Sequence, residues 1–171
     1  MPRPNNRESG FSLIELLIVV AIILVLAVIT VPNLLRSKIA ANEASAVQSL
    51  RQIATAELSY STSYPAVGYA PDLPSLGGPP GCTPAPANAC ILDDIVTSRN
   101  KSGYLFFAAG FVGGGVTNTT FVASAAPQKF NTTGVRLFCI ATDDGSLRSK
   151  PGTPGAVPAP DVPTCIAYPS M

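Results

Sequence analysis

The chain is 171 residues long, with 47% hydrophobic residues, 12% charged residues and 17 prolines. Soluble domains usually carry about twice that share of charge and about half that share of proline, so an ordinary cytosolic enzyme is a poor description. The absence of histidine excludes Ser-His-Asp and Cys-His catalysis, histidine-ligated zinc and CxxCH haem attachment within this chain. Its net charge of +1 offers nucleic acid no electrostatic footprint. We expect one domain with at most an appendage, and no nucleic-acid partner.

The main feature is an apolar run of 21 residues that begins at Phe11 and ends at Val31. Only three polar residues interrupt it: Ser12, Glu15 and Thr30. A helix of this length spans a bilayer. A secretory signal peptide is the alternative, but its apolar region is roughly 7 to 15 residues and ends at a small-residue cleavage site. Here Thr-Val-Pro-Asn follows instead, and basic residues before the run favour a cytoplasmic N-terminus with the rest of the chain outside.

Two residues at the start of this run do not fit a plain membrane anchor. Glu15 is a carboxylate inside an apolar segment, where a lone charge costs a few kcal/mol in lipid. Either it lies near enough to the interface to stay hydrated, or it pairs with a positive group on a neighbouring subunit. Gly10, before Phe11, is a small residue between a basic decapeptide and the apolar helix, where a protease at the membrane face could reach the backbone.

The segment from Gly10 to Val19, with the sequence GFSLIELLIV, resembles the prepilin processing motif of type IV pilins and type II secretion pseudopilins. Pro32 also falls where many of these proteins carry a helix-loosening proline. The resemblance implies that residues 1–10 are a leader, that an inner-membrane prepilin peptidase cuts after Gly10, and that it methylates the new amine of Phe11. It implies that Glu15 neutralises the Phe11 amine of an adjacent subunit during assembly. The membrane-bound precursor would then enter an extracellular pilus or a periplasmic pseudopilus.

Beyond Pro32 the helical period continues, so we expect one helix with a membrane-spanning half at 11–32 and an amphipathic half at 33–63. Pro32 has no N–H to donate and should kink or loosen the helix. The apolar positions that recur at threes and fours in the second half are Ile39, Ala46, Val47, Leu50, Ile53, Ala54 and Leu58.

The remainder predicts a small head with an α+β fold. Residues 64–103 are so rich in proline and glycine that we expect a connector without long regular elements. Residues 104–150 contain runs of aromatic and β-branched residues that predict an antiparallel sheet of three to four strands. One apolar face of that sheet should pack on the second half of the helix, as in the layout of the pilin family. Residues 151–171 form a proline-rich tail.

The four cysteines favour two disulfides if the head faces an oxidising compartment. Three connectivities are open, and we favour Cys82 with Cys90 and Cys139 with Cys165. The second pair would fasten the tail to the last long strand, and it resembles the C-terminal loop that many pilins close in this way. A metal or redox centre is the alternative, but the spacings match no zinc pattern and there is no CxxC.

Two further signals are weak. Asp143 and Asp144 are a candidate for calcium, as in some secretion pseudopilins, but an Asp-Asp-Gly segment is more often only a hairpin turn. Asn118 and Asn131 fit the glycosylation sequon, which in an extracytoplasmic bacterial head is mostly chance.

Three classes of function compete: a filament subunit, a membrane-anchored enzyme and a tethered binding domain. We expect no enzyme and no cofactor, since no catalytic constellation is visible. A tethered binder needs the helix but not Gly10, Phe11 or Glu15. The prediction is a type IV pilin, with a type II secretion pseudopilin as the alternative, and with three partners: other copies of itself, a prepilin peptidase and methyltransferase, and an assembly platform in the inner membrane.

Overall fold

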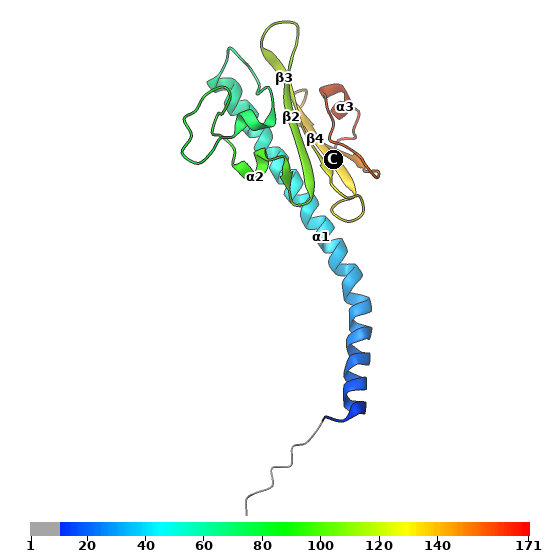
Figure 1. Ribbon diagram of the computed structural model, residues 1–171. Coiled ribbons are helices and arrows are strands. Elements are labelled where there is room, and N and C mark those ends of the chain that lie inside the picture. The colour runs from blue at the N-terminus through cyan, green and yellow to red at the C-terminus, as the bar shows by residue number, and fades with distance from the viewer. Residues whose placement is uncertain (1–10) are drawn as a thin grey trace, which may run out of the picture. The chain divides into compact units, whose positions relative to one another are not determined.

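The computed structural model describes residues 11–171, so Gly10 and the rest of the leader lie outside it. The chain divides into two compact units, one ending at Ser37 and the other comprising Lys38–Met171. Helix α1, Leu13–Ser63, contributes to both units (Figure 1). It ends at Ser63, where the helical period of the sequence also ends.

The first part of α1 is rich in leucine, isoleucine and valine, and polar side chains near Pro32 bond to the helix's own backbone. Pro32 lies inside the helix and cannot donate a backbone hydrogen bond. Polar side chains next to it bond back to earlier carbonyls: Thr30 Oγ1 donates to Leu26 O at 3.0 Å, and Asn33 Nδ2 donates to Ile29 O at 3.2 Å. The helix is continuous through Pro32, and a bend at this residue stays a prediction.

The head contains one antiparallel sheet in the order β1-β2-β3-β4-β5. The five strands are β1 (Asn100–Lys101), β2 (Tyr104–Val112), β3 (Asn118–Pro127), β4 (Arg136–Ala141) and β5 (Leu147–Pro151). The α+β fold class is confirmed, and the predicted count of three to four strands is wrong by one. The strand that sequence patterning missed is β1, which has two polar residues and therefore no hydrophobic alternation.

The core lies between the sheet and the second half of α1. Leu50, Ile53 and Tyr60 of the helix are buried in one cluster with Tyr104 and Phe138 of the sheet. Seven residues separate Ile53 from Tyr60, so they share one face of the helix. The expectation that this face supplies the core of the head is confirmed.

The connector holds only short regular elements, and it joins the core of the head. It contains the 3-10 helix η1 (Leu73–Leu76) and the short helix α2 (Asp94–Thr97), and it adds Ala70, Ala89 and Val96 to the main core. Asp72 and Asp93 cap these two helices through their side chains. The proline and glycine content limits the length of each element but does not keep the segment out of the core.

The sheet is covered on both faces, not on one. The tail and helix α3 (Val162–Ile166) form a second cluster with Val122, Leu137 and Cys139, while α1 covers the opposite face (Figure 1). Strand β3 is accordingly buried without interruption from Phe121 to Pro127. Continuous burial of this kind follows when both faces of a strand are covered.

Candidate functional site

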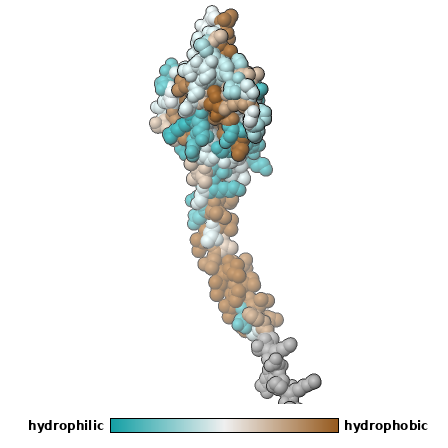
Figure 2. Space-filling model, turned by 90° about the vertical axis from the view of Figure 1, so that its left-hand side faces the viewer, coloured by the Kyte–Doolittle hydropathy of each residue, from teal (hydrophilic) through white to brown (hydrophobic). Residues whose placement is uncertain are grey.

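The apolar half of α1 is an exposed surface in the single chain. Phe11 is 76% exposed, and the large apolar side chains that follow are exposed as far as Leu35. By length and composition α1 is able to cross a membrane. Figure 2 shows this continuous hydrophobic surface along the helix. An uncovered apolar surface of this extent marks a site for lipid or for other protein.

Glu15 and Phe11 lie together at the N-terminal end of this surface. Leu16 N donates to Ser12 O at 3.2 Å, so the helical ladder begins at Ser12. Glu15 is therefore in the first turn, where free N–H groups and the helix dipole favour a carboxylate. Neither ion pair in the described part of the chain involves Glu15.

All four cysteines are paired in the head. Cys139 on β4 is joined to Cys165 on α3 with the Cα atoms 5.8 Å apart, and Cys82 is joined to Cys90 with the Cα atoms 6.3 Å apart. These are the two pairs that the sequence analysis favours. Cys139 and Cys165 are both fully buried, so their disulfide fastens the tail to the sheet from inside the second core cluster.

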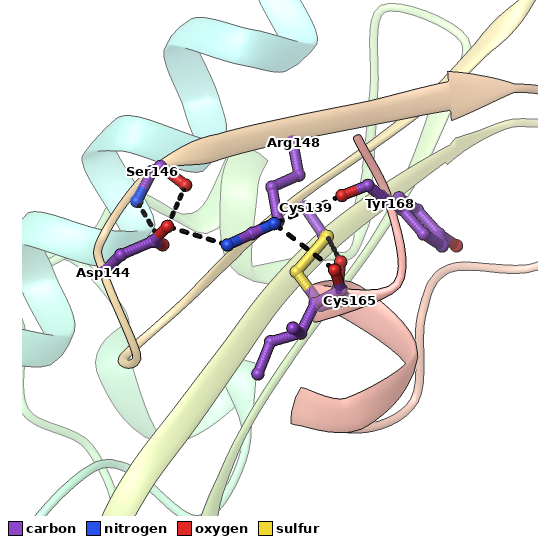
Figure 3. A network of polar contacts seen from close by, with 7 residues as sticks. Cys139, Asp144, Ser146, Arg148, Cys165 and Tyr168 are labelled. Atoms are coloured by element: carbon purple, nitrogen blue, oxygen red, sulfur yellow. Dashed lines mark hydrogen bonds and ion pairs between the residues drawn. A yellow bond between two sulfur atoms is a disulfide. The ribbon is translucent and has the colours of Figure 1, made fainter. Parts of the chain in front are cut away.

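Asp144 is engaged in a protein network and not in a cluster of acidic ligands (Figure 3). Its carboxylate accepts from Ser146 N at 2.9 Å, Ser146 Oγ at 2.7 Å and Arg148 Nη2 at 2.7 Å. The Ser146 hydrogen bonds and then Arg148 hold the pKa of Asp144 below its usual value. Arg148 Nη1 also donates to the carbonyls of Ile166 and Tyr168, both at 3.3 Å. The turn that contains Asp143 and Asp144 therefore helps to hold the tail.

No group of three or more His, Cys, Asp or Glu side chains gathers within residues 11–171 in a way that could hold a metal ion. The calcium hypothesis for Asp143 and Asp144 gains no support from the arrangement of the described residues.

Sequence patterning missed two carboxylates on the buried face of α1. Glu43 and Glu57 occupy positions on the same face as Ala46, Leu50 and Ile53. Leu58, which the pattern assigned to that face, is 55% exposed, so that assignment is wrong. The spacing of three and four from residue 43 to residue 60 could have revealed the two glutamates, but a charged residue reads as solvent-facing.

Glu57 is fully buried, and only one of its two carboxylate oxygens has a hydrogen-bond partner among the described residues. Its Oε2 accepts from Ala70 N at 2.8 Å, while Oε1 has no hydrogen-bond partner among the described residues. Burial raises the pKa of Glu57 to about 8, against a smaller opposing effect of the Ala70 hydrogen bond. This side chain is therefore mostly protonated at neutral pH.

Residues 5–31 match the family described as the prokaryotic N-terminal methylation motif. The matched range includes Gly10, Phe11 and Glu15 and ends one residue before Pro32. The chain is also 39% identical over 77 residues to the type IV major pilin protein PilA of Myxococcus xanthus (strain DK1622). Both matches support the type IV pilin and pseudopilin family. The predicted family resemblance is thereby confirmed, and the pilin-type motif coincides with the exposed apolar half of α1.

The similarity to the Myxococcus pilin covers 41% of this chain and 35% of the relative. The chain thus spans about a third of the length of the relative it matches. No solved structure matches the chain.

Proposed function

We propose that this chain is the precursor of a filament subunit, a type IV pilin that is cleaved after Gly10 and methylated on the new amine of Phe11. The observation that carries the proposal is the coincidence of the methylation motif with the apolar surface from Phe11 to Leu35. A membrane anchor alone needs the apolar surface but not the motif. The similarity to a relative named as a major pilin supports a pilin, and pseudopilins share the same type of N-terminus.

The proposed path of the subunit from membrane to filament follows from what can cover its apolar surface. In the precursor, lipid covers the segment from Phe11 to Val31, which is long enough to cross the hydrocarbon core. In the filament, the same segments of sister subunits replace lipid. The partners are other copies of this chain, the prepilin peptidase and methyltransferase, and an assembly platform in the inner membrane. Precursors reside in that membrane with the leader on the cytoplasmic side, and assembled subunits lie outside the cell.

Glu15 makes this replacement of lipid by sister subunits selective. Cleavage creates a positive amine on Phe11 at the end of an apolar helix, and a bundle of such helices excludes water from it. An unpaired charge there is costly. The carboxylate of Glu15, which has no ion-pair partner in the described chain, would offset the amine of an adjacent subunit. The product is a structural filament, and the proposed role involves no catalysis by this chain.

The test is a comparison of processing and assembly in cells that contain a prepilin peptidase. Wild-type protein should be recovered in sheared, sedimentable filaments, and its intact mass should correspond to a chain that starts at Phe11 and carries one methyl group. Gly10→Val should leave uncut precursor in the inner membrane, whereas the adjacent control Ser9→Val should be cut. A mature protein that starts at any other residue would overturn the proposal.

The pseudopilin alternative predicts the same cleavage but a different destination. In that case the processed protein would stay in the cell envelope and its loss would block the export of a secreted protein, without loss of surface filaments. A tethered binding domain would be neither cut at Gly10 nor found in filaments.

A further inference from the structure

Basic side chains gather at one end of the head. Strand β2 begins, β3 ends and β4 begins at this end, because Tyr104 pairs with Pro127 and Lys101 pairs with Tyr104. Arg99 precedes β1, and Lys129 lies two residues beyond the end of β3. Figure 2 shows hydrophilic side chains around the lower part of the head. We call the two exposed lysines nearest the start of the head's helical part, Lys38 and Lys129, the basal surface.

The part of α1 that belongs to the head also begins at this end. Asn42 Nδ2 donates to Thr133 O at 2.9 Å, and the hydroxyls of Ser45 and Ser102 are 2.9 Å apart. Lys101 Nζ donates to Ser49 Oγ at 3.0 Å. These contacts fix the first turns of the helical part of the head against the loops that carry Lys101 and Lys129. Lys38 lies one helical turn before Asn42 and is exposed at this end.

Chain connectivity places this surface near a bilayer. Lys38 is seven residues after Val31, the last residue of the apolar run, and seven helical residues rise only about 10 Å. The headgroup layer on each side of the hydrocarbon core is roughly 5 to 8 Å thick. Lys38 therefore lies close to the headgroups by chain connectivity, and Lys129 lies about one helical turn farther along, because its loop contacts the helix at Asn42.

The charge of the basal surface is not neutralised within the head. The two ion pairs in residues 11–171 join Arg136 to Glu43 and Arg148 to Asp144, so Lys38 and Lys129 take part in neither. Asp144 lies after the far end of β4, away from this surface.

The acidic residues of α2 lie farther along the helix than the basal surface. Asp93 lines a groove with Gln52 and Thr55 of α1, at least fourteen residues beyond Lys38. Its carboxylate also accepts from Val96 N at 3.0 Å, which caps α2. The basal surface therefore keeps a net positive charge.

We propose that the basal surface binds the anionic phospholipid headgroups of the bilayer that holds α1, so that the head of the membrane-bound subunit rests on the membrane. This inference rests on the membrane insertion in the proposed function. Juxtamembrane lysine and arginine are attracted by anionic lipids within a Debye length of the surface. The contact is consequently sensitive to salt and to lipid charge, and a subunit loses it on entering a filament.

The test uses the full chain in vesicles of phosphatidylcholine, alone or mixed with anionic phosphatidylglycerol, each with a trace of headgroup-spin-labelled lipid. The chain has no tryptophan, so a single introduced tryptophan reports contact by quenching. Thr132→Trp places the reporter on the exposed loop beside Lys129, and Val116→Trp places it at the opposite end of the sheet, where Val116 is 96% exposed. We expect at least twofold stronger quenching of the Thr132 reporter in anionic vesicles, abolished by high salt, and no change for the Val116 reporter.

Charge-removal variants test which side chains are responsible. Lys38→Gln combined with Lys129→Gln should remove most of the difference between the two lipid compositions. Arg51→Gln, a control that removes an exposed charge farther along α1, should preserve it.

The outcomes separate this inference from the proposed function. If the protein does not float with vesicles of either composition, membrane insertion fails and this inference fails with it. If the protein floats but the Thr132 reporter is quenched equally in both lipids, the basal surface does not bind headgroups. If quenching depends on protein density and not on lipid charge, the surface contacts another copy of the chain, which also overturns the inference.

Discussion

The guanidinium of Arg136 at the start of β4 holds the carboxylate of Glu43 on α1, with Nε and Nη2 at 2.9 and 2.7 Å from Oε2. The other oxygen, Oε1, accepts from the backbone N–H groups of Val135 at 3.0 Å and Arg136 at 3.2 Å. Glu43 is only 5% exposed. The helix is thus fastened to the sheet by a buried carboxylate whose two oxygens are both satisfied.

Glu43→Ala should destabilise the head by about 2 to 4 kcal/mol, because it leaves two backbone donors and a guanidinium without their acceptor. Thermal unfolding of the full chain in detergent, followed by circular dichroism, measures this loss. Asp144→Asn is the control, since it weakens an ion pair whose carboxylate side chain is 43% exposed and should cost much less. Equal losses of stability for the two variants would show that the Glu43 carboxylate holds α1 to the sheet no more strongly than an exposed ion pair does.

Periodicity predicted the elements of this fold whose side chains alternate regularly between core and solvent. The apolar run and its amphipathic continuation indicated α1, and the aromatic and β-branched runs indicated β2, β3 and β4. The Asp143-Asp144-Gly145 turn indicated the hairpin into β5. Each of these signals is local, so it can be read from a few consecutive residues.

The missed features depend on tertiary contacts that leave no local pattern. The connector enters the core because its backbone pairs with distant strands: Gly110 N donates to Ala70 O at 2.7 Å, and Asn118 N donates to Val67 O at 2.8 Å. Glu43 is buried because β4 supplies donors from residues more than ninety positions away. At the candidate site, the motif identified Phe11 and Glu15, whereas the basal surface emerged only when the strands were placed side by side.

The buried carboxyl of Glu57 should make the head less stable as pH rises. Its pKa is about 8 in the folded chain, against an ordinary value near 4.3, so between these values the folded state holds a proton that the unfolded state has released. Linkage then requires stability to fall with pH through this window, by on the order of 5 kcal/mol in all. The chain has no histidine to titrate in the same range.

Glu57→Gln should flatten this dependence, because the amide mimics the protonated carboxyl and keeps an acceptor for Ala70 N. The variant should be more stable than wild type at pH 7, by on the order of 3 kcal/mol. Unfolding curves at pH 5, pH 6.5 and pH 8 would check both expectations. A wild-type protein whose stability rises over this range would contradict the expected fall.

Loss of the Cys139–Cys165 disulfide should cost more than loss of the Cys82–Cys90 disulfide. The first closes a sequence separation of 26 residues and the second a separation of 8, so chain entropy predicts roughly 3.5 and 2.5 kcal/mol. Cys139 and Cys165 are also fully buried, which adds a packing loss when both become alanine. Thermal unfolding of the two double-alanine variants gives the order, and non-reducing peptide mapping of the exported protein should recover the Cys139–Cys165 peptide.

Gly68→Ala should strongly destabilise the head, and the same change at Gly81 separates steric overlap from backbone strain as the cause. Gly68 has φ of +82°, and an added Cβ would press on the carbonyl oxygen of Asn118. Gly81 has nearly the same φ, +79°, but an added Cβ there would meet nothing within 4 Å. Gly81→Ala should therefore cost only the left-handed backbone strain, about 1 to 2 kcal/mol, and Gly68→Ala distinctly more. Similar melting temperatures for the two variants would show that the contact with Asn118 is loose.

The carboxylate of Glu15 should matter for assembly and not for the stability of the head. Glu15→Ala should be cleaved and inserted normally, because neither lipid burial of the helix nor access to Gly10 needs the charge. Assembly should fail because the amine of Phe11 would enter an apolar bundle unpaired, at a cost of about 3 kcal/mol, which predicts a loss of at least about tenfold in sheared filaments. Glu15→Asp, whose carboxylate has a shorter reach, should be intermediate, and Glu15→Ala should enter filaments mainly when wild-type subunits are present.

Immunoblots of sheared and membrane fractions measure both the assembled and the membrane-bound subunits, and circular dichroism of the Glu15→Ala protein should show a head as stable as wild type. If Glu15→Ala alone formed filaments at wild-type abundance, the pairing role would be wrong and Glu15 would be a carboxylate that simply stays hydrated at the membrane interface.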